Sequence, residues 1–339
     1  MNTTPFTALP DLASRALGGS VVFANDELFA ARENLITPTA PVFDADEFGP
    51  RGKVYDGWET RRRREPGSDY AIVRLGVAGV VRGVAVDTSW FTGNFPPHVS
   101  VEAASLDGYP TVEETLDAPW TPLVPRSPVV GDSANAFQVE HTHRFTHVRL
   151  TIYPDGGVAR LRVHGEPVLD PAVLTGTVDL AALENGADVV ACSDMFYSSA
   201  RNLLMPGRAR HMGEGWENAR RRDDGNDFVT VRLAAAGTVR RVVVDTSHFV
   251  GNAPGWVSLQ GVDTTRHPVQ DPDAWFGLLP RTRVLPDLRH QLAVESHEPV
   301  THVRLDVFPD GGLARLRILG ELTDEGMAAL EDRHRAGLG

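Results

Sequence analysis

The chain contains the same sequence pattern twice. Asp69-Tyr-Ala-Ile-Val-Arg-Leu75 returns as Asp227-Phe-Val-Thr-Val-Arg-Leu233, and His147-Val-Arg-Leu150 returns as His302-Val-Arg-Leu305. The period is close to half the chain, which is far longer than the unit of a solenoid. The sequence therefore predicts two copies of one globular domain, called copy one and copy two below.

We expect residues 1–168 to form the first repeat, residues 177–323 the second, and residues 324–339 a C-terminal helix or tail. Each copy is long enough to bury a core of its own. The register between the copies slips where copy one carries extra residues between Pro38 and Lys53. Length differences of this kind are typical of surface loops.

Composition limits the partners and the compartment. The net charge of -12 argues against nucleic-acid or anionic-membrane partners, and no apolar run approaches the roughly 18 residues of a membrane span. The N-terminus lacks a secretory pattern, and the single cysteine, Cys192, excludes an internal disulfide framework and a Cys-rich zinc site. We expect a cytoplasmic protein.

Alternation with a period of two runs through both copies. In residues 146–152 the apolar side chains share one face and His147 falls on the other, and residues 159–163 alternate in the same way, with Arg160 on the polar face. This pattern is typical of half-buried strands. Between them, Pro154-Asp-Gly-Gly157 predicts a turn, because proline fixes φ and glycine accepts positive φ.

Further strands are expected at residues 70–75, 80–87 and 99–103, separated by glycine or proline. Short antiparallel strands with this spacing indicate an all-β fold, a tandem duplicated jelly-roll β-sandwich. Helices are few: a short one at residues 26–33 with its copy, and one from Asp324 to about Arg335.

One polar cluster combines an aromatic, a carboxylate and arginines. Gly57-Trp-Glu59 precedes the arginine run 61–64, and its counterpart is Gly215-Trp-Glu217 followed by Arg220 to Arg222. Guanidinium forks pair well with planar anions, so this cluster is a candidate ligand wall. The alternative is a solvated charged strand with Trp58 in the core.

A second cluster, Asp87-Thr-Ser-Trp-Phe-Thr-Gly-Asn94, follows an apolar strand and returns as residues 245–252, with His248 in place of Trp90. A strand end can open a ligand site, whereas an aspartate there can also serve only to form an Asx-turn. Both interpretations stay open.

The remaining clusters have simple structural alternatives. His147-Val-Arg149 with Asp155, and their copies, could face a ligand or only solvent. Asp26 and its counterpart Asp194 fit a charge at a helix start. His141-Thr-His143 could be a metal pair, but it is not duplicated. No cofactor is predicted, and a divalent metal is conceivable without support from the sequence.

Three strings together resemble the allantoicase (allantoate amidinohydrolase) family: Lys53 to Arg63, Asp87 to Asn94, and Tyr153 to Arg162. The resemblance extends from about Asp11 to Glu321. It implies tandem galactose-binding-like jelly rolls, an assembly into a homo-oligomer, and a hydrolase of purine breakdown. The implied reaction converts allantoate and water into ureidoglycolate and urea.

Under that resemblance the repeated clusters take expected roles. Arginines would bind the substrate carboxylate, a carboxylate would activate water, and a histidine would protonate the leaving nitrogen. The candidate catalytic residues are Glu59, Asp87, His147, Glu217, Asp245 and His248. The candidate substrate-binding residues are Trp58, Arg61, Arg63, Thr88, Asn94, Arg220, Arg221 and Asn252. The alternative function is a non-catalytic tandem module that binds carbohydrate or another small ligand.

Overall fold

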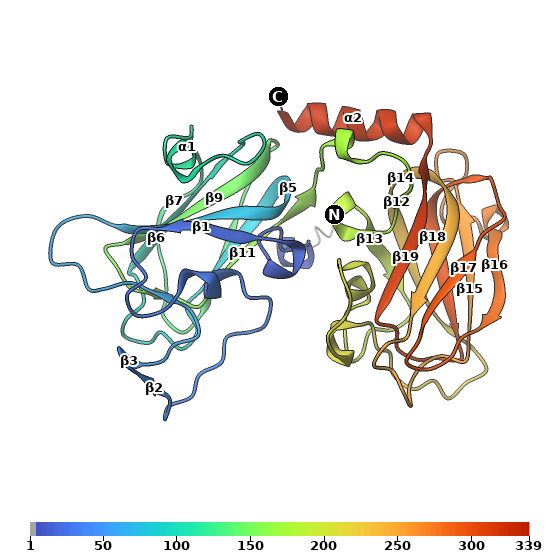
Figure 1. Ribbon diagram of the computed structural model, residues 1–339, viewed down its shortest axis with the longest axis horizontal. Coiled ribbons are helices and arrows are strands. Elements are labelled where there is room, and N and C mark those ends of the chain that lie inside the picture. Colours follow the sequence, from blue (N-terminus) through green and yellow to red (C-terminus); the bar gives the residue numbers. More distant parts are fainter. Residues whose placement is uncertain (1–4, 339) are drawn as a thin grey trace. The chain divides into compact units, whose positions relative to one another are not determined.

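A computed structural model describes residues 5–338 of the chain (Figure 1). It separates into two compact units: the first comprises the residues up to Val168 together with those from Arg335 onward, and the second spans Leu169–His334. Each unit is built mainly from antiparallel strands, and the strand order of one is repeated in the other. The expected all-β, duplicated fold is confirmed.

Copy one contains one large sheet system. The strands run in the order β1-β5-β9-β6-β7, and both β8 and β11 also pair with β5. Two short pairs, β4 with β10 and β2 with β3, lie outside this sheet. The bounds are β1 (Ser20–Ala24), β2 (Phe48–Gly49), β3 (Gly52–Lys53), β4 (Trp58–Glu59), β5 (Asp69–Asp87), β6 (His98–Ala104), β7 (Thr121–Pro128), β8 (Ala134–Gln138), β9 (Arg144–Tyr153), β10 (Gly157–Val158) and β11 (Arg160–Pro167).

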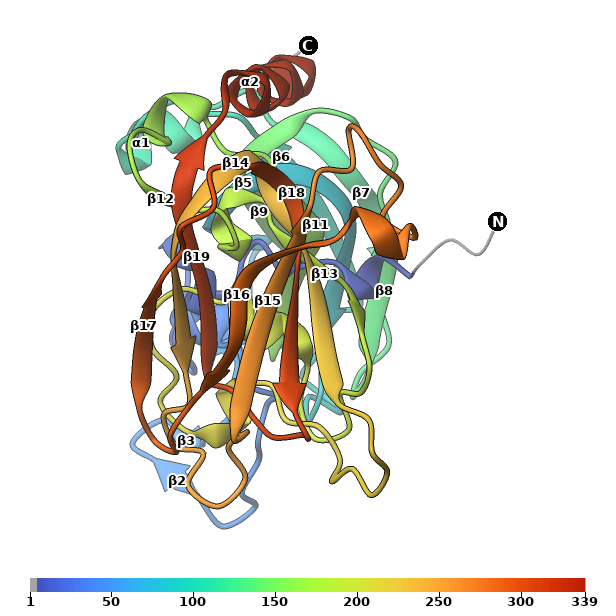
Figure 2. The same cartoon turned by 90° about the vertical axis from the view of Figure 1, so that its right-hand side faces the viewer.

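Copy two repeats this arrangement, and its strands face the viewer in Figure 2. Here β14 takes the place of β5, in the order β12-β19-β14-β18-β15-β16, with β13 and β17 also paired to β14. The bounds are β12 (Val178–Asp179), β13 (Asp188–Cys192), β14 (Asp227–Asp245), β15 (Trp256–Val262), β16 (Phe276–Arg283), β17 (Arg289–Ala293), β18 (Pro299–Phe308) and β19 (Arg315–Leu322).

The long strand β5 joins the two layers of the copy-one sandwich. Its first half pairs with β1 and β9, and its second half with β8 and β11. The prediction of two separate strands, 70–75 and 80–87, is therefore wrong. Gly76 and Gly79 suggested a break, yet they serve close packing: a Cβ on Gly76 would lie 2.5 Å from the Leu17 carbonyl oxygen.

Helices are short apart from the last. The predicted C-terminal helix is confirmed as α2 (Asp324–Leu338), and α1 (Val112–Leu116) begins with a capping box. Single 3-10 turns connect the strands: η1 (Phe6–Ala8), η2 (Arg15–Leu17), η3 (Arg32–Ile36), η4 (Pro171–Val173), η5 (Leu183–Asn185), η6 (Ala200–Leu204), η7 (Met212–Glu214) and η8 (Pro272–Ala274).

The helix predicted at residues 26–33 is wrong. Only its last residues enter η3, and Asp26 does not start a helix. The Asp26 carboxylate instead accepts hydrogen bonds from the backbone N–H of Leu28 and, across the chain, of Arg61. The aspartate therefore ties a loop to a distant segment, which local sequence patterns do not reveal.

Two polar side chains lie buried where alternation predicted an exposed face. His147 is 2% exposed and Arg160 is fully buried. Arg160 donates to the carbonyls of Thr39 (3.1 Å) and Asp56 (2.9 Å), and it forms an ion pair with the Asp56 carboxylate at 2.6 Å. These partners are the two ends of the copy-one extension, defined here as residues 39–56. In copy two, Arg315 is buried likewise and donates to the Glu214 carbonyl at 2.6 Å.

Replacing Arg160 by Met should destabilise copy one by about 3 kcal/mol, because it removes a buried guanidinium that pairs with the Asp56 carboxylate and donates to the carbonyls of Thr39 and Asp56. Denaturant unfolding of the full chain measures the loss. Arg82→Met, which breaks an ion pair between two exposed side chains, should cost less than about 1 kcal/mol. Equal effects of the two substitutions would contradict the anchoring role of Arg160.

Candidate active site

The short strand β4 separates a core residue from a candidate catalytic one. Trp58 is fully buried, and its indole N–H donates to the Asp26 carbonyl at 2.8 Å. Because successive side chains of a strand point to opposite faces, Glu59 faces away from that core. Trp216 is equally buried and donates to the Asp194 carbonyl at 2.8 Å. Trp58 is therefore a core residue, which is the second of the two interpretations given for this cluster.

Glu59 meets the end of the second cluster. The Asn94 side-chain amide donates to the Glu59 carboxylate at 2.7 Å, and in copy two Asn252 donates to Glu217 at 2.6 Å. The Asn94 carbonyl also accepts from the Gly157 N–H at 2.7 Å. Position 157 must be glycine, since a Cβ there would lie 2.0 Å from the Phe91 ring. This close packing brings the 87–94 turn against β4.

The surroundings of Glu59 suit proton transfer. Burial raises the pKa of its carboxyl group above the usual value, and the Asn94 hydrogen bond offsets part of that shift. Its cross-strand neighbours are Ala30 and Gly157, two of the smallest residues. Directly opposed side chains share a face. The Phe91 ring fills the space over Gly157, so Ala30 is the small neighbour that leaves space beside the carboxylate.

Arg61 lies two residues after Glu59, on the same face if the strand direction continues. Its side chain is 65% exposed, and its Nε forms an ion pair with Asp26. Burial works to raise the Asp26 pKa, but hydrogen bonds from the N–H of Arg61 and Leu28 and the Arg61 guanidinium hold it below its usual value. The pair fixes the Arg61 stem while its terminal nitrogens lie toward solvent.

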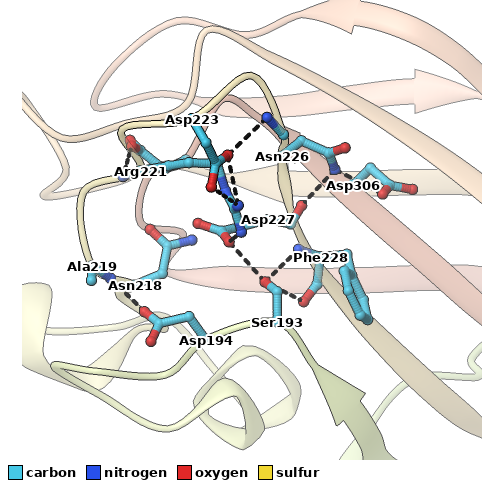
Figure 3. Close-up of polar contacts among 12 residues, drawn as sticks. Ser193, Asp194, Asn218, Ala219, Arg221, Asp223, Asn226, Asp227, Phe228 and Asp306 are labelled. Carbon is cyan, nitrogen blue, oxygen red and sulfur yellow. Dashed lines mark hydrogen bonds and ion pairs between the residues drawn. The ribbon is translucent and has the colours of Figure 1, made fainter.

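Arg63 and Arg221 are held by internal partners. The Arg63 N–H donates to Asp155 at 2.8 Å, and its guanidinium contacts the buried carboxylate of Asp69 at 2.5 Å. Arg221 repeats this with Asp310 and Asp227, and it also pairs with Asp223, as Figure 3 shows in part. Both arginines stabilise a loop. Arg220 is exposed.

Asp87 and Thr88 make turn contacts at the end of β5. The Asp87 carboxylate accepts from the Ser89 N–H (2.8 Å) and hydroxyl (2.6 Å), while Thr88 is fully buried and donates to the Val130 carbonyl at 2.7 Å. Asp245 accepts from the Ser247 N–H at 2.9 Å. These bonds are those of the Asx-turn alternative.

The structure does not bring His147 to Glu59. His147 lies on β9, six residues before Tyr153, the last residue of that strand. At about 3.3 Å per residue, His147 is therefore some 20 Å from the end of β9 that leads to β10. Burial, with the nearby Arg74 charge, lowers the His147 pKa to about 4, so its ring is neutral at physiological pH. His248 belongs to copy two, where its Nε2 lies 3.0 Å from the Ala209 carbonyl oxygen.

Sequence reasoning missed a cavity of about 290 Å³ in copy one. Its lining joins Phe29, Ala30, Ala31 and Asn34 to residues 49–55 of the extension. Such a volume is close to the lower limit for small-ligand pockets, about 300 Å³. Ala30 exchanges backbone hydrogen bonds with Glu59, so the cavity borders the Glu59 strand. The sequence feature that could have indicated this cavity is Lys53, a lysine of copy one that has no counterpart in copy two.

A larger cavity of about 690 Å³ lies elsewhere in copy one, around Phe6, Arg82 and Glu166. Glu166 is near the far end of β11 from Arg160, so this cavity is remote from Glu59. Among residues 5–338, no group of three or more His, Cys, Asp or Glu side chains is placed to hold a metal ion. The His141 and His143 rings pack edge to face at 4.7 Å.

Comparison with known proteins identifies the family. The family model described as the allantoicase repeat matches residues 10–168 and again residues 178–323. The chain belongs to the allantoicase family. A probable allantoicase of Nocardia farcinica is 56% identical to it, covering 94% of this chain and 95% of the relative. A probable allantoicase of Streptomyces coelicolor is 50% identical, covering 98% and 90%.

A solved allantoicase structure has the same fold. The Saccharomyces cerevisiae allantoicase crystal structure superposes with a TM-score of 0.77 at 35% identity, covering 92% of this chain and 93% of that one. Both copies therefore belong to one enzyme family, and the carbohydrate-module alternative is not favoured. No helix in the described part of the chain has the length and apolar character to cross a membrane.

Proposed function

We propose that this protein hydrolyses allantoate to ureidoglycolate and urea, with the Glu59 carboxylate as the group that moves the proton. The observation that carries the proposal is the Glu59–Asn94 pair: a half-buried carboxylate with a raised pKa, oriented by an amide on a face flanked by Ala30 and Gly157. Membership of the allantoicase family supplies the substrate and reaction.

The chemistry needs one carbon–nitrogen bond exchanged for one carbon–oxygen bond. Allantoate carries a carboxylate and two ureido arms on one carbon. Water attacks that carbon as Glu59 accepts a water proton, and the bond to one ureido nitrogen breaks. The proton then passes to that nitrogen, so that urea leaves and ureidoglycolate stays. Arg61, exposed two residues after Glu59, would hold the substrate carboxylate with its terminal nitrogens.

Glu59→Gln should lower kcat for urea release by about 10²-fold or more, because the amide keeps the hydrogen bond from Asn94 but cannot accept the proton. A coupled urea assay on purified protein with allantoate measures this. Glu65→Gln, an exposed carboxylate in the following loop, is the matched control and should keep wild-type activity. Full activity in Glu59→Gln would remove Glu59 from the mechanism.

The pH profile tests the Glu59–Asn94 bond. If Glu59 acts ionised, kcat/KM falls as the pH drops through its pKa, which burial places above the usual value of about 4.3 for glutamate. Asn94 stabilises the charged form, so Asn94→Leu should raise this pKa and move the acid limb to higher pH. A limb that stays in place, or moves to lower pH, would contradict the assignment.

The proposal assigns proton transfer and carboxylate binding to side chains, so metal removal should leave activity unchanged. Dialysis against EDTA followed by the urea assay, with and without added Mg²⁺, Mn²⁺ or Zn²⁺, measures this. Loss on chelation with recovery on one added ion would show that a metal takes part, and the assignment to side chains alone would then be wrong.

We also propose that the protein assembles as a homo-oligomer in the cytoplasm. The resemblance to allantoicases supports the assembly, and a single unpaired cysteine fits a reducing compartment. Light scattering after size-exclusion chromatography gives the mass in solution, to be compared with the chain mass of 36.8 kDa. A mass equal to one chain at micromolar concentration would refute the assembly.

A further inference from the structure

We infer that copy one alone carries a working site, and that its extension and Arg61 form the part that binds the anionic end of the substrate. The inference rests on the proposed function and asks which copy performs it. The two copies share the Glu–Asn pair, so the difference must lie in what surrounds the pair.

The first difference is a missing guanidinium. Position 61 of copy one corresponds to Ala219 of copy two. The Ala219 N–H still donates to Asp194 (Figure 3), as the Arg61 N–H of copy one does to Asp26. The backbone frame is therefore kept in copy two while the charge is absent. Copy one alone places an exposed arginine at this position, two residues after its glutamate.

The second difference is the extension, which packs on the copy-one turn. Phe43 stacks on Tyr55 (centroids 5.3 Å apart) and on Trp90 (5.7 Å), and Tyr55 stacks on Phe91 (4.8 Å). The Trp90 indole N–H donates to the Pro41 carbonyl at 3.1 Å. With Arg160 holding both ends, these contacts fix the extension against the same 87–94 turn that supplies Asn94.

The third difference is charge at the cavity of about 290 Å³. Both Arg51 and Lys53 line it. The Lys53 ammonium lies 5.2 Å from the Phe43 ring centroid and 5.5 Å from that of Phe48, within cation–π range. Arg51 donates to the Leu28 carbonyl. Two cations at a small cavity that borders the Glu59 strand suit a small carboxylate-bearing ligand.

In copy two, different side chains surround the Glu217–Asn252 pair. The Met212 sulfur lies 3.3 Å from the Asn252 amide nitrogen, so an apolar side chain sits against the Glu217–Asn252 pair. Ser198, opposite Glu217, stands where copy one has the smaller Ala30. The loop residues Met195, Phe196 and Tyr197 are more than half exposed. This loop corresponds to residues 27–29 of copy one, where the extension contacts Leu28 and Phe29 lines the cavity.

Steady-state kinetics on allantoate with the full chain separates the copies. Arg61→Ala gives copy one the residue of copy two, and it should raise KM about tenfold or more with kcat changed less. Lys53→Met should act in the same direction, and Lys53→Arg should restore most of the loss because the cation remains. Glu217→Gln should keep the wild-type kcat. Melting temperatures without substrate verify that each variant folds.

Several outcomes would overturn the inference. Glu217→Gln activity lowered as far as that of Glu59→Gln would show that both pairs are needed, and activity halved by each would show two working copies. Wild-type KM in both Arg61→Ala and Lys53→Met would remove the binding role of the extension.

Failure of the proposed function gives a different result. If the wild type releases no urea from allantoate, that function fails, and the pocket is then tested by binding alone. Allantoate should raise the melting temperature of the wild type, and Lys53→Met or Arg61→Ala should abolish the rise. A rise that survives in both variants, or none in the wild type, would refute the pocket independently of catalysis.

Discussion

The site of each copy depends on a buried tryptophan next to an outward-facing glutamate. Trp58 enters the core, and its indole N–H holds the Asp26 carbonyl; the Asp26 carboxylate then holds the segment that carries Arg61. Because one strand residue points in, its neighbour must point out. One packing interaction thus fixes the direction of Glu59 and the position of the loop beside it.

The two copies show how one frame supports different surroundings. The tryptophan, the aspartate bond and the Glu–Asn contact occur in both, with nearly equal distances. What differs lies in loops and at single exposed positions, where a change costs little stability. Arg61 faces solvent in copy one, and its counterpart is an alanine that leaves the backbone bonds intact.

Much of the fold follows from sequence because strand alternation and duplication are visible in it. Duplication also selected Glu59 and Asn94, although nothing local indicated that the two would touch. The burial of Arg160 was not predicted, because a charged side chain is normally exposed; its partners, the carbonyls of Thr39 and Asp56, are distant in sequence. The continuity of β5 was not predicted either, because glycine normally indicates a break; Gly76 instead packs against the distant Leu17. The extension was visible in the sequence as a slip in register, but its role was not predicted because repetition cannot select a feature found once.

The arginines at the start of β11 and β19 bind main-chain carbonyls: Arg160 that of Asp56, and Arg315 that of Glu214 at the equivalent place. Every residue type has a carbonyl, so this part of the anchor does not depend on the side chains of the loop, although in copy one Arg160 also pairs with the Asp56 carboxylate. It is also indifferent to loop length, because copy one carries the longer loop on the same contact. A domain with such an arginine can carry a different loop at this place without a change in its core. Residues 39–56 are therefore a suitable segment for loop-grafting experiments between the two copies.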